Sequence, residues 1–229
     1  MYDRVRPGYP SEAVSWLIPR DARVVVDIGA GTGALTRSLV TLGLEVIAVE
    51  PDEKMREVLA SRSPSADVRE GRAEEIPLED AEADAVVGGQ MWHWVDLEPA
   101  TAEVARVLKP GGTLGLVWNQ RNDSVPWMAE LSAIFGSEQV ESSPTEVMIA
   151  PGAPFRDVAS AEFSFVQCLA SVDLVNFVAS RSHIQVMDPA RRAELLERVE
   201  LFSRTHPDLE GKESIEVPYV TECWRATRA

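Results

Sequence analysis

The sequence predicts a doubly wound α/β fold, in which helices cover both faces of a mostly parallel sheet. Short apolar, β-branched runs at 24–28, 46–49 and 83–89 alternate with segments whose apolar residues recur at helical spacing. Continuous apolar runs are typical of strands buried on both faces, and the alternation is typical of parallel sheets. Ligands of such sheets bind at the carboxyl ends of the strands, near the point where strand order reverses.

The first strand ends in a glycine-rich loop at Asp27-Ile28-Gly29-Ala30-Gly31-Thr32-Gly33. Leu35, Leu39 and Leu42 then recur at helical spacing, and Gly43 marks the end of that helix. Glycines let the backbone approach a ligand closely, and a helix N-terminus behind the loop favours a negatively charged ligand group. The loop is therefore predicted to cradle a cofactor.

The residues alone leave the kind of cofactor open. Gly29, Gly31 and Ala34 also fit the G-x-G-x-x-A form of the nicotinamide dinucleotide fingerprint, and Glu50 stands about where its ribose-binding acid belongs. An NAD(P)-dependent oxidoreductase is therefore one alternative. A loop that only packs helix against strand is disfavoured, because glycines at alternate positions cost backbone entropy.

The other elements of the first half are predicted from the spacing of apolar residues and from the prolines and glycines that end helices and strands. Ser11 is expected to cap a short helix, and Pro51-Asp52 to open a helix with Met55, Val58 and Leu59 facing inward. A third strand is expected at 67–69, a loop at 70–77, a helix ending in a turn at Lys109-Pro110-Gly111-Gly112, and a fifth strand at 113–118.

The second half is less regular. We expect a helix bearing Trp127 to Phe135, a loop at 137–156, a sixth strand at 161–167, two helices beginning near 171 and 188, and a last strand at 215–224. The whole chain, 1–229, is expected to be one domain. Its parts would be an N-terminal flap and helix (1–20), a cofactor-binding core (21–118), and a substrate-side half (119–229) with a helical lid insert at about 171–206.

Composition restricts the partners. The chain has 22 basic and 37 acidic residues and a formal net charge of −15, which opposes non-specific binding to nucleic acid or anionic membranes. A small-molecule substrate is the expectation, and oligomeric state is left open. Cys168 and Cys223 lack metal-binding spacing, so no metal site is expected. The N-terminus does not resemble a signal peptide, and no apolar run would span a bilayer, so a cytoplasmic location is expected.

Four motifs, in order and spacing, resemble class I S-adenosylmethionine-dependent methyltransferases of the small-molecule type. They are Asp27-x-Gly29-x-Gly31-x-Gly33, Val49-Glu50-Pro51, Gly71-x-Ala73-Glu74-x-Ile76-Pro77 and Leu108-Lys109-Pro110-Gly111-Gly112. The opening Tyr2-x-x-x-Arg6-Pro7-x-Tyr9-Pro10 and the Trp92-His93-Trp94 stretch further resemble a subgroup that includes trans-aconitate methyltransferase-like enzymes.

This resemblance implies the Rossmann-like methyltransferase fold with sheet order 3-2-1-4-5-7-6, its seventh strand antiparallel. It implies S-adenosyl-L-methionine as cofactor and S-adenosyl-L-homocysteine as product. The glycine loop would hold the methionine portion, Glu50 the ribose, and Ala73 with Glu74 the adenine. The full candidate cofactor-binding set is Asp27, Gly29, Ala30, Gly31, Gly33, Glu50, Pro51, Ala73, Glu74, Gln90, Tyr9 and Arg6.

The acceptor side is read from fewer residues. His93 is a candidate general base for an acceptor that must lose a proton, since an imidazole ordinarily titrates near pH ~6.5; a packed ring in an aromatic wall is the alternative. Trp92, Trp94 and Arg181 are candidate substrate residues, and Arg181 is expected to anchor a carboxylate. A protein that binds the cofactor without catalysis remains a further alternative.

Overall fold

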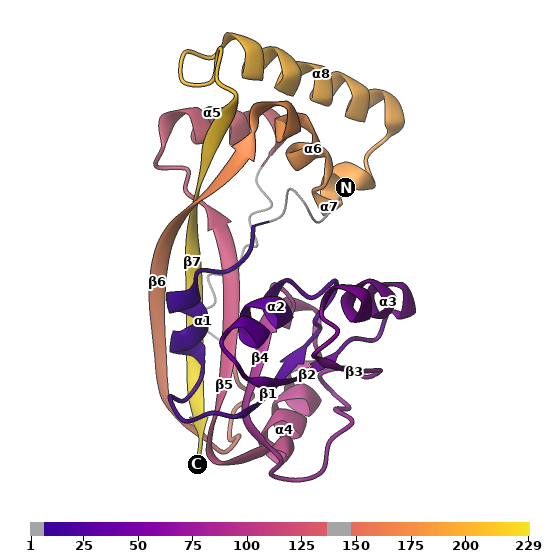
Figure 1. Ribbon diagram of the computed structural model, residues 1–229, viewed down its shortest axis with the longest axis vertical. Helices are drawn as coiled ribbons and strands as arrows, with labels where there is room; N and C mark the ends of the chain where they lie inside the picture. The colour runs from indigo at the N-terminus through magenta and orange to yellow at the C-terminus, as the bar shows by residue number, and fades with distance from the viewer. Residues whose placement is uncertain (1–6, 137–147) are drawn as a thin grey trace. The chain divides into compact units, whose positions relative to one another are not determined.

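In the computed structural model of the protein, residues 7–136 and 148–229 are described. They form a seven-stranded sheet of order β3-β2-β1-β4-β5-β7-β6 (Figure 1). Neighbouring strands from β3 to β5 are parallel, while β7 runs opposite to β5 in Figure 1. The predicted doubly wound fold and strand order are confirmed. The strands are β1 (Val24–Ile28), β2 (Glu45–Val49), β3 (Asp67–Arg69), β4 (Ala83–Gly89), β5 (Leu108–Arg121), β6 (Phe155–Ala170) and β7 (Ser214–Arg228).

Helices connect these strands. They are α1 (Ser11–Leu17), α2 (Ala34–Thr41), α3 (Glu53–Arg62), the short 3₁₀ helix η2 (Trp92–Trp94), α4 (Leu97–Val107), α5 (Pro126–Phe135), η3 (Ser171–Asp173), α6 (Leu174–Ala179), α7 (Ser182–Gln185) and α8 (Pro189–Thr205). The chain divides into two compact units. The first is built mainly from 120–136 and 164–220, and the second from 8–119, 148–163 and 221–229. The expectation of one domain over 1–229 stays a prediction.

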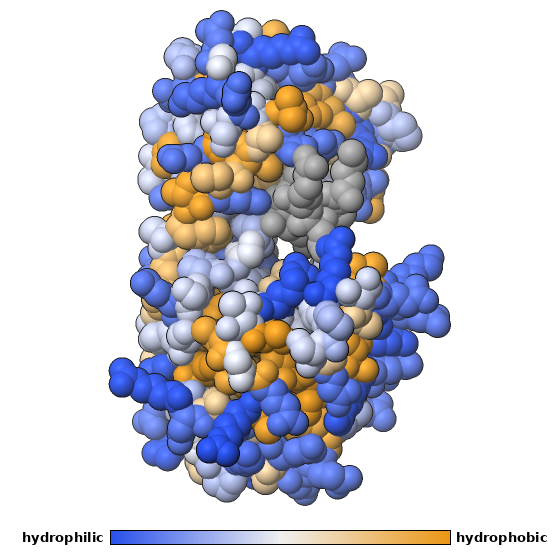
Figure 2. Space-filling view, in the orientation of Figure 1, coloured by the Kyte–Doolittle hydropathy of each residue, from blue (hydrophilic) through white to orange (hydrophobic). Residues whose placement is uncertain are grey.

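The first unit has its own apolar core, made by α5, α6, α8 and the neighbouring parts of β6 and β7. Met128, Leu131, Phe177 and Val199 are fully buried there. Helix α8 begins at Asp188, whose carboxylate accepts hydrogen bonds from the amides of Ala190 and Arg191. The surface where α8 lies in Figure 1 is largely hydrophilic in Figure 2, while Leu195 and Val199 of this helix are buried.

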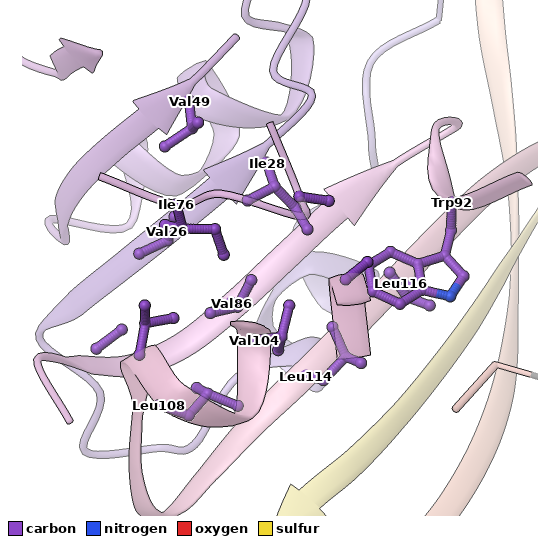
Figure 3. Close-up of a cluster of buried hydrophobic side chains, with 14 of the residues drawn as sticks. Val26, Ile28, Val49, Ile76, Val86, Trp92, Val104, Leu108, Leu114 and Leu116 are labelled. Carbon is purple, nitrogen blue, oxygen red and sulfur yellow. The ribbon is translucent and has the colours of Figure 1, made fainter. Parts of the chain in front are cut away.

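The second unit buries its strands on both faces. Side chains alternate along a strand, so Val26 and Val86 pack with Val104 of α4 on one face (Figure 3). Val25 and Val87 pack with α1 and α2 on the other face. This double burial is the reason why β1, β2 and β4 read as continuous apolar runs in the sequence.

Several expectations about the helices were wrong. Pro10, not Ser11, precedes α1, and the Val14 amide donates to the Pro10 carbonyl. Met55 is exposed, and Leu59 is the buried residue of α3. The insert holds the three α-helices α6, α7 and α8 among the described residues, where two helices were expected.

The expected turn at 109–112 lies within β5 and is an irregularity in its pairing with β4. The register runs from Ala83 opposite Leu108 to Ala85 opposite Thr113, so β5 carries extra residues there. Gly111 takes a φ of 80°, which a glycine adopts without strain. Strand β6 also begins earlier than expected, at Phe155, so the expected loop at 137–156 ends sooner; its residues 137–147 lie outside the described residues.

Candidate functional site

The glycine loop turns the chain from β1 into α2. Gly29, Gly31 and Gly33 all have positive φ, at 59°, 56° and 86°. A residue with a side chain adopts this left-handed region only at a cost. The alternate glycines of the sequence are therefore required by the backbone path itself.

Only the middle glycine of the loop faces open space. A Cβ on Gly29 would lie 3.0 Å from the side chain of Met91, and one on Gly33 would collide with Leu59. A Cβ on Gly31 would have no heavy atom of the described residues within 4 Å. Gly31 is thus the place where the loop leaves room for a ligand against its backbone.

Glu50 lies at the end of β2 and is bonded to the glycine loop. The Gly31 amide donates to Glu50 Oε2 at 2.8 Å, and the Asp52 amide donates to Oε1 at 3.0 Å. The Glu50 residue is only 6% exposed. Because each carboxylate oxygen has two acceptor sites, both oxygens retain capacity for a further donor. The carboxylate is held in one orientation, as binding of a vicinal diol requires.

Three backbone amides of the glycine loop donate hydrogen bonds to acceptors within the protein. Besides the Gly31 bond, the Ala30 amide donates to the Val49 carbonyl at 3.1 Å and the Gly33 amide to the Ala30 carbonyl at 2.9 Å. From the sequence, the N-terminus of the helix behind this loop is expected to favour a negatively charged ligand group. The three loop amides named here are bonded within the protein, and they tie the loop to itself, to β2 and to Glu50.

Asp27, at the end of β1, is almost completely buried. Thr36 Oγ1 donates to its Oδ2 at 2.5 Å, whereas Oδ1 has no hydrogen-bond partner among the described residues. Burial raises the pKa of Asp27 from 3.8 to about 7; the hydrogen bonds from Thr36 oppose this rise, and the nearby Glu50 carboxylate adds to it. A cationic group placed at Oδ1 would satisfy the oxygen and favour its charged form.

The loop after β3 is folded tightly against the sheet. Gly71 has no room for a Cβ, which would lie 2.8 Å from Pro77 Cδ and 2.9 Å from Val49 Cγ1. Ala73 is buried in the core, while Glu74 Oε1 accepts a hydrogen bond from the Asp96 amide at 2.9 Å. Glu74 therefore links this loop to the start of α4.

Arg106 of α4 braces the same loop from behind. Its guanidinium donates to the carbonyls of Ile76 and Leu78 and to the carboxylates of Asp80 and Glu103. Hydrogen bonds from Arg106 lower the pKa of Glu103 despite its partial burial. Sequence reasoning missed this brace, because its partners lie up to 30 positions apart.

The carboxyl end of β4 is followed by two further residues of interest, Gln90 and Met91. Gln90 has a φ of 60°, an unusual conformation for a residue with a side chain, and its Nε2 donates to the Asn119 carbonyl at 3.1 Å. The next residue, Met91, lies within reach of a Cβ on either Gly29 or Gly88. Met91 was also missed by sequence reasoning, and it packs the end of β4 against the glycine loop.

The N-terminal segment reaches the same strand ends. Asn119 Nδ2 donates to the Gly8 carbonyl at 3.0 Å, and Thr221 Oγ1 holds the Asn119 side chain at 2.7 Å. The Tyr9 hydroxyl lies 2.6 Å from the position that a Cβ on Gly89 would occupy. Tyr9 is therefore close to the end of β4, whereas the predicted cofactor residue Arg6 lies outside the described residues.

The aromatic stretch after β4 separates into buried and exposed rings. Trp92 is buried in the core (Figure 3). Its Nε1 donates to the Met148 carbonyl at 3.0 Å. His93 is exposed, and Trp94 is 81% exposed with its ring 4.9 Å from the imidazole. The candidate base is therefore accessible, and the roles of all three residues stay predictions.

Arg181 lies in the first unit, after α6. Its guanidinium stacks over Phe177, with Cζ 4.5 Å from the ring centroid, and Nη2 donates to the Tyr219 hydroxyl at 3.3 Å. The candidate cofactor residues other than Arg6 lie in the second unit.

No helix of the described residues is long and apolar enough to span a membrane. Nor do those residues include three or more His, Cys, Asp or Glu side chains grouped to hold a metal ion.

Comparison with known families gives a match over the strands that build this site. A family model described as a methyltransferase domain matches residues 26–116. That range begins within β1 and ends within β5, so it includes the glycine loop, Glu50 and the braced loop at 70–77.

Similar chains extend over nearly the whole sequence. An uncharacterised methyltransferase of Mycobacterium tuberculosis is 45% identical over 229 residues, covering 100% of this chain and 93% of the relative. A methyltransferase-like protein of Schizosaccharomyces pombe is 33% identical over 230 residues, covering 96% and 90%. The structure of a proposed type II methyltransferase from Anaeromyxobacter dehalogenans has a TM-score of 0.69 at 21% identity, covering 97% of both chains.

Proposed function

We propose that this chain, which belongs to the methyltransferase family, uses S-adenosyl-L-methionine to methylate a small-molecule acceptor. The observation that carries the proposal is the open backbone at Gly31, whose amide is bonded to the buried Glu50 carboxylate. A cofactor with a ribose diol fits there, because Glu50 keeps acceptor sites free on both oxygens.

Residues on either side of Gly31 and Glu50 suit the methionine portion and the adenine of the cofactor. Asp27 offers a buried carboxylate oxygen without a partner among the described residues, which suits the ammonium group of the methionine portion. Ala73 is buried in the loop that Arg106 braces, and adenine would lie beside this loop. We assign Asp27, Gly31, Glu50 and Ala73 to the cofactor on these grounds.

The bound cofactor would supply a methyl group on a sulfonium, which an acceptor attacks in line from the opposite side. The protein contributes mainly position and exclusion of water, and positioning can lower a barrier by about 7 to 11 kcal/mol. An anionic oxygen acceptor needs no base. For a hydroxyl or amine acceptor, the exposed imidazole of His93 would take the proton at a ring nitrogen.

Calorimetric titration with S-adenosyl-L-homocysteine and, separately, with NADH tests the cofactor. We expect saturable binding of the first and none of the second. The oxidoreductase alternative left open by the glycine pattern predicts the reverse. Family membership already favours methyl transfer over hydride transfer.

Turnover needs its own measurement. The protein is incubated with S-adenosyl-L-methionine and a panel of small acids, phenols and amines, and S-adenosyl-L-homocysteine is quantified by mass spectrometry. Acceptor-dependent product supports the proposal. Tight cofactor binding with no product from any acceptor would instead favour a binding protein.

A further inference from the structure

Gln90 follows β4 in a backbone conformation that favours glycine. Its φ is 60°, in the left-handed region, where a residue with a side chain is strained. The glycine loop meets the same requirement with Gly29 and Gly31, whose φ values are 59° and 56°. A glutamine stands at position 90 although glycine would be unstrained there, and strained residues of this kind cluster at functional sites.

The Gln90 side chain is fixed at one end. Its Nε2 donates to the Asn119 carbonyl at 3.1 Å, and its backbone amide donates to the Val117 carbonyl at 2.9 Å. Asn119 is itself held, because its side chain donates to the Gly8 carbonyl and accepts from Thr221. A carbonyl can only accept, so the amide nitrogen of Gln90 must face Asn119, and Oε1 points away from it.

The amide oxygen, Oε1, is the open end of this side chain. No described residue donates a hydrogen bond to it, and Gln90 is exposed. It is thus an oriented acceptor at the surface of the second unit. An oriented group loses less entropy than a mobile one when a ligand donor reaches it.

The register of the sheet places Gln90 beside the glycine loop. Asp27 of β1 pairs with Val87 of β4, so the chain at Gly29 is level with the end of β4. Met91, the residue after Gln90, lies 3.0 Å from the position of a Cβ on Gly29. Parallel sheets bind ligands at these strand ends. Gln90 therefore belongs to the ligand-binding edge of the sheet, next to the proposed cofactor.

Two other residues with side chains have positive φ in the described part of the chain, Ala81 at 55° and Asp157 at 53°. Ala81 lies before β4, at the amino end of that strand, and Asp157 lies in the edge strand β6. Neither stands at the carboxyl ends of the parallel strands. Gln90 alone of the three combines backbone strain with a position where ligands bind.

The charge of this region favours a cation. Residues 73–105, which include β4, contain no lysine or arginine, and Asp96 and Glu98 near the start of α4 are exposed. The chain as a whole has a formal net charge of −15. Such a field attracts cationic ligands and repels anions. Amines are protonated in neutral water, so an amine is attracted to this region and a carboxylic acid is not.

We propose that Gln90 selects an amine as the methyl acceptor, by accepting a hydrogen bond from the nitrogen that is methylated. An amide oxygen accepts hydrogen bonds and is not a base at neutral pH, so the nucleophile keeps its hydrogen while bound. A neutral amine can react in this state. A hydroxyl needs a base, and a carboxylate has no hydrogen to donate. Gln90 is a candidate cofactor residue from sequence, and we assign its oxygen to the acceptor; the methyl donor rests on the proposed function.

Methyl transfer to a bound amine begins when its ammonium form loses a proton, to His93 or to water, which frees the nitrogen lone pair. That pair forms a bond to the methyl carbon while the carbon–sulfur bond breaks, and the electrons of the broken bond stay on sulfur. The products are a protonated, methylated amine and S-adenosyl-L-homocysteine. Gln90 Oε1 holds one N–H during this step and so orients the lone pair.

Turnover of matched compounds tests the acceptor class. Butylamine, benzylamine and tryptamine, each beside the alcohol and the carboxylic acid of the same skeleton, are incubated with S-adenosyl-L-methionine, and S-adenosyl-L-homocysteine is quantified. Amines should react faster than their counterparts. Faster product formation from the alcohols or the acids overturns the amine class.

Replacing Gln90 tests the residue. Gln90→Gly removes the amide oxygen and should keep the fold, because glycine adopts the positive φ without strain. The kcat/KM for the best amine should fall about tenfold, as expected for one lost hydrogen bond, while S-adenosyl-L-homocysteine affinity stays close to that of wild type. Ala81→Gly is the matched control, since it relieves the same strain at the other end of β4 and should change neither quantity. Unchanged amine kinetics in Gln90→Gly overturn the role of Gln90.

The Gln90→Glu variant adds a readout that a purely structural role would not move. A carboxylate beside the bound nitrogen favours its ammonium form. Because kcat reports ionisations in the bound complex, the pH at half-maximal kcat for the amine should rise. An unchanged pH profile would show that Oε1 does not contact the nucleophile.

Cofactor binding separates this inference from the proposed function. If wild type does not bind S-adenosyl-L-homocysteine in calorimetry, the proposed function is refuted, whatever the amines do. Cofactor binding without product from any of the amines refutes the amine acceptor and leaves the proposed cofactor intact.

Discussion

The amide of Gly31 donates a hydrogen bond to Glu50 Oε2 at 2.8 Å, and this bond joins the two halves of the candidate cofactor site. It connects the loop after β1 to the end of β2. A ligand that lies against Gly31 is therefore placed beside a carboxylate whose orientation is already set. The first two predictions test the two sides of this relationship.

Replacing Glu50 should weaken cofactor binding more than it weakens the fold. Glu50→Ala removes the acceptor of a ribose diol, and we expect S-adenosyl-L-homocysteine affinity to fall by about 1.5 to 3 kcal/mol, the range for hydrogen bonds to a charged group. Glu50→Gln should also lose affinity, because its amide nitrogen would face a backbone donor at Gly31 or Asp52. Calorimetry measures both, with the exposed Glu53→Gln as control. Normal binding by Glu50→Ala would refute the ribose role.

Gly31→Val should abolish cofactor binding in a domain that still folds. The branched side chain would fill the open space against the loop, and the positive φ adds backbone strain. Gly43→Val is the matched control, since Gly43 also has positive φ, at 81°, with no heavy atom within 4 Å of its Cβ position. Both variants should lose similar thermal stability, but only Gly31→Val should lose S-adenosyl-L-homocysteine binding. If both variants bind normally, the cradle is assigned wrongly.

The core of this site was predictable from sequence because its signals are local. Gly29, Gly31 and Gly33 are adjacent to a strand that is buried on both faces, and this burial leaves an uninterrupted apolar run. Glu50 follows a second run of the same kind. Motif order and spacing supported the resemblance to class I methyltransferases, and the strand order was predicted from that resemblance.

The rest depends on contacts between distant residues or on weak patterns. The Arg106 brace and the bond between Asp27 and Thr36 arise only when the chain has folded. Strand β6 buries little: its residues alternate between partly buried and exposed, so no strong apolar run marks its beginning at Phe155. Met55 was placed inward by helical spacing, but α3 buries only Leu59.

Asp27 should make stability fall as pH rises from about 4 to about 7. The unfolded carboxyl ionises near its ordinary pKa of 3.8, while the folded one keeps its proton up to a pKa of about 7. In that window the folded state binds more protons, so each pH increase favours unfolding. A shift of this size corresponds to at most about 4 kcal/mol.

Asp27→Asn should flatten this slope, because an amide does not titrate and its oxygen still accepts from Thr36. Urea unfolding at intervals from pH 4.5 to 8 measures the difference, which should grow with pH in favour of the variant. The exposed Asp21→Asn is the control. Parallel curves for wild type and Asp27→Asn would contradict the raised pKa.

Asp84, unlike Asp27, should make the protein less stable as pH falls. Burial raises the pKa of this carboxyl, but hydrogen bonds from Lys109 and from the amides of Val24 and Arg23 outweigh that effect and lower it. Its contribution to stability is therefore present above an ordinary Asp pKa of about 4 and is lost as pH falls through the lower folded value. Asp84→Asn should cost about 1 to 3 kcal/mol at pH 7. A double-mutant cycle with Lys109→Met measures the coupling free energy between the two side chains. If the cycle shows no coupling, this explanation of the Asp84 pKa is wrong.

Tyr9 should slow release of the cofactor by occupying the end of β4. Its hydroxyl lies 2.6 Å from the position of a Cβ on Gly89, so Gly89→Ala must move the tyrosine away. We expect Tyr9→Ala and Gly89→Ala each to speed dissociation of S-adenosyl-L-homocysteine in stopped-flow experiments, with smaller changes in melting temperature. The double variant should release no faster than Tyr9→Ala, because the side chain displaced by Gly89→Ala is already gone.

Additive effects of the two changes, or a release rate unaffected by Tyr9→Ala, would show that the tyrosine does not retain the cofactor. Deletion of residues 1–10 should release at least as fast as Tyr9→Ala, since it removes the whole segment that Asn119 holds at Gly8.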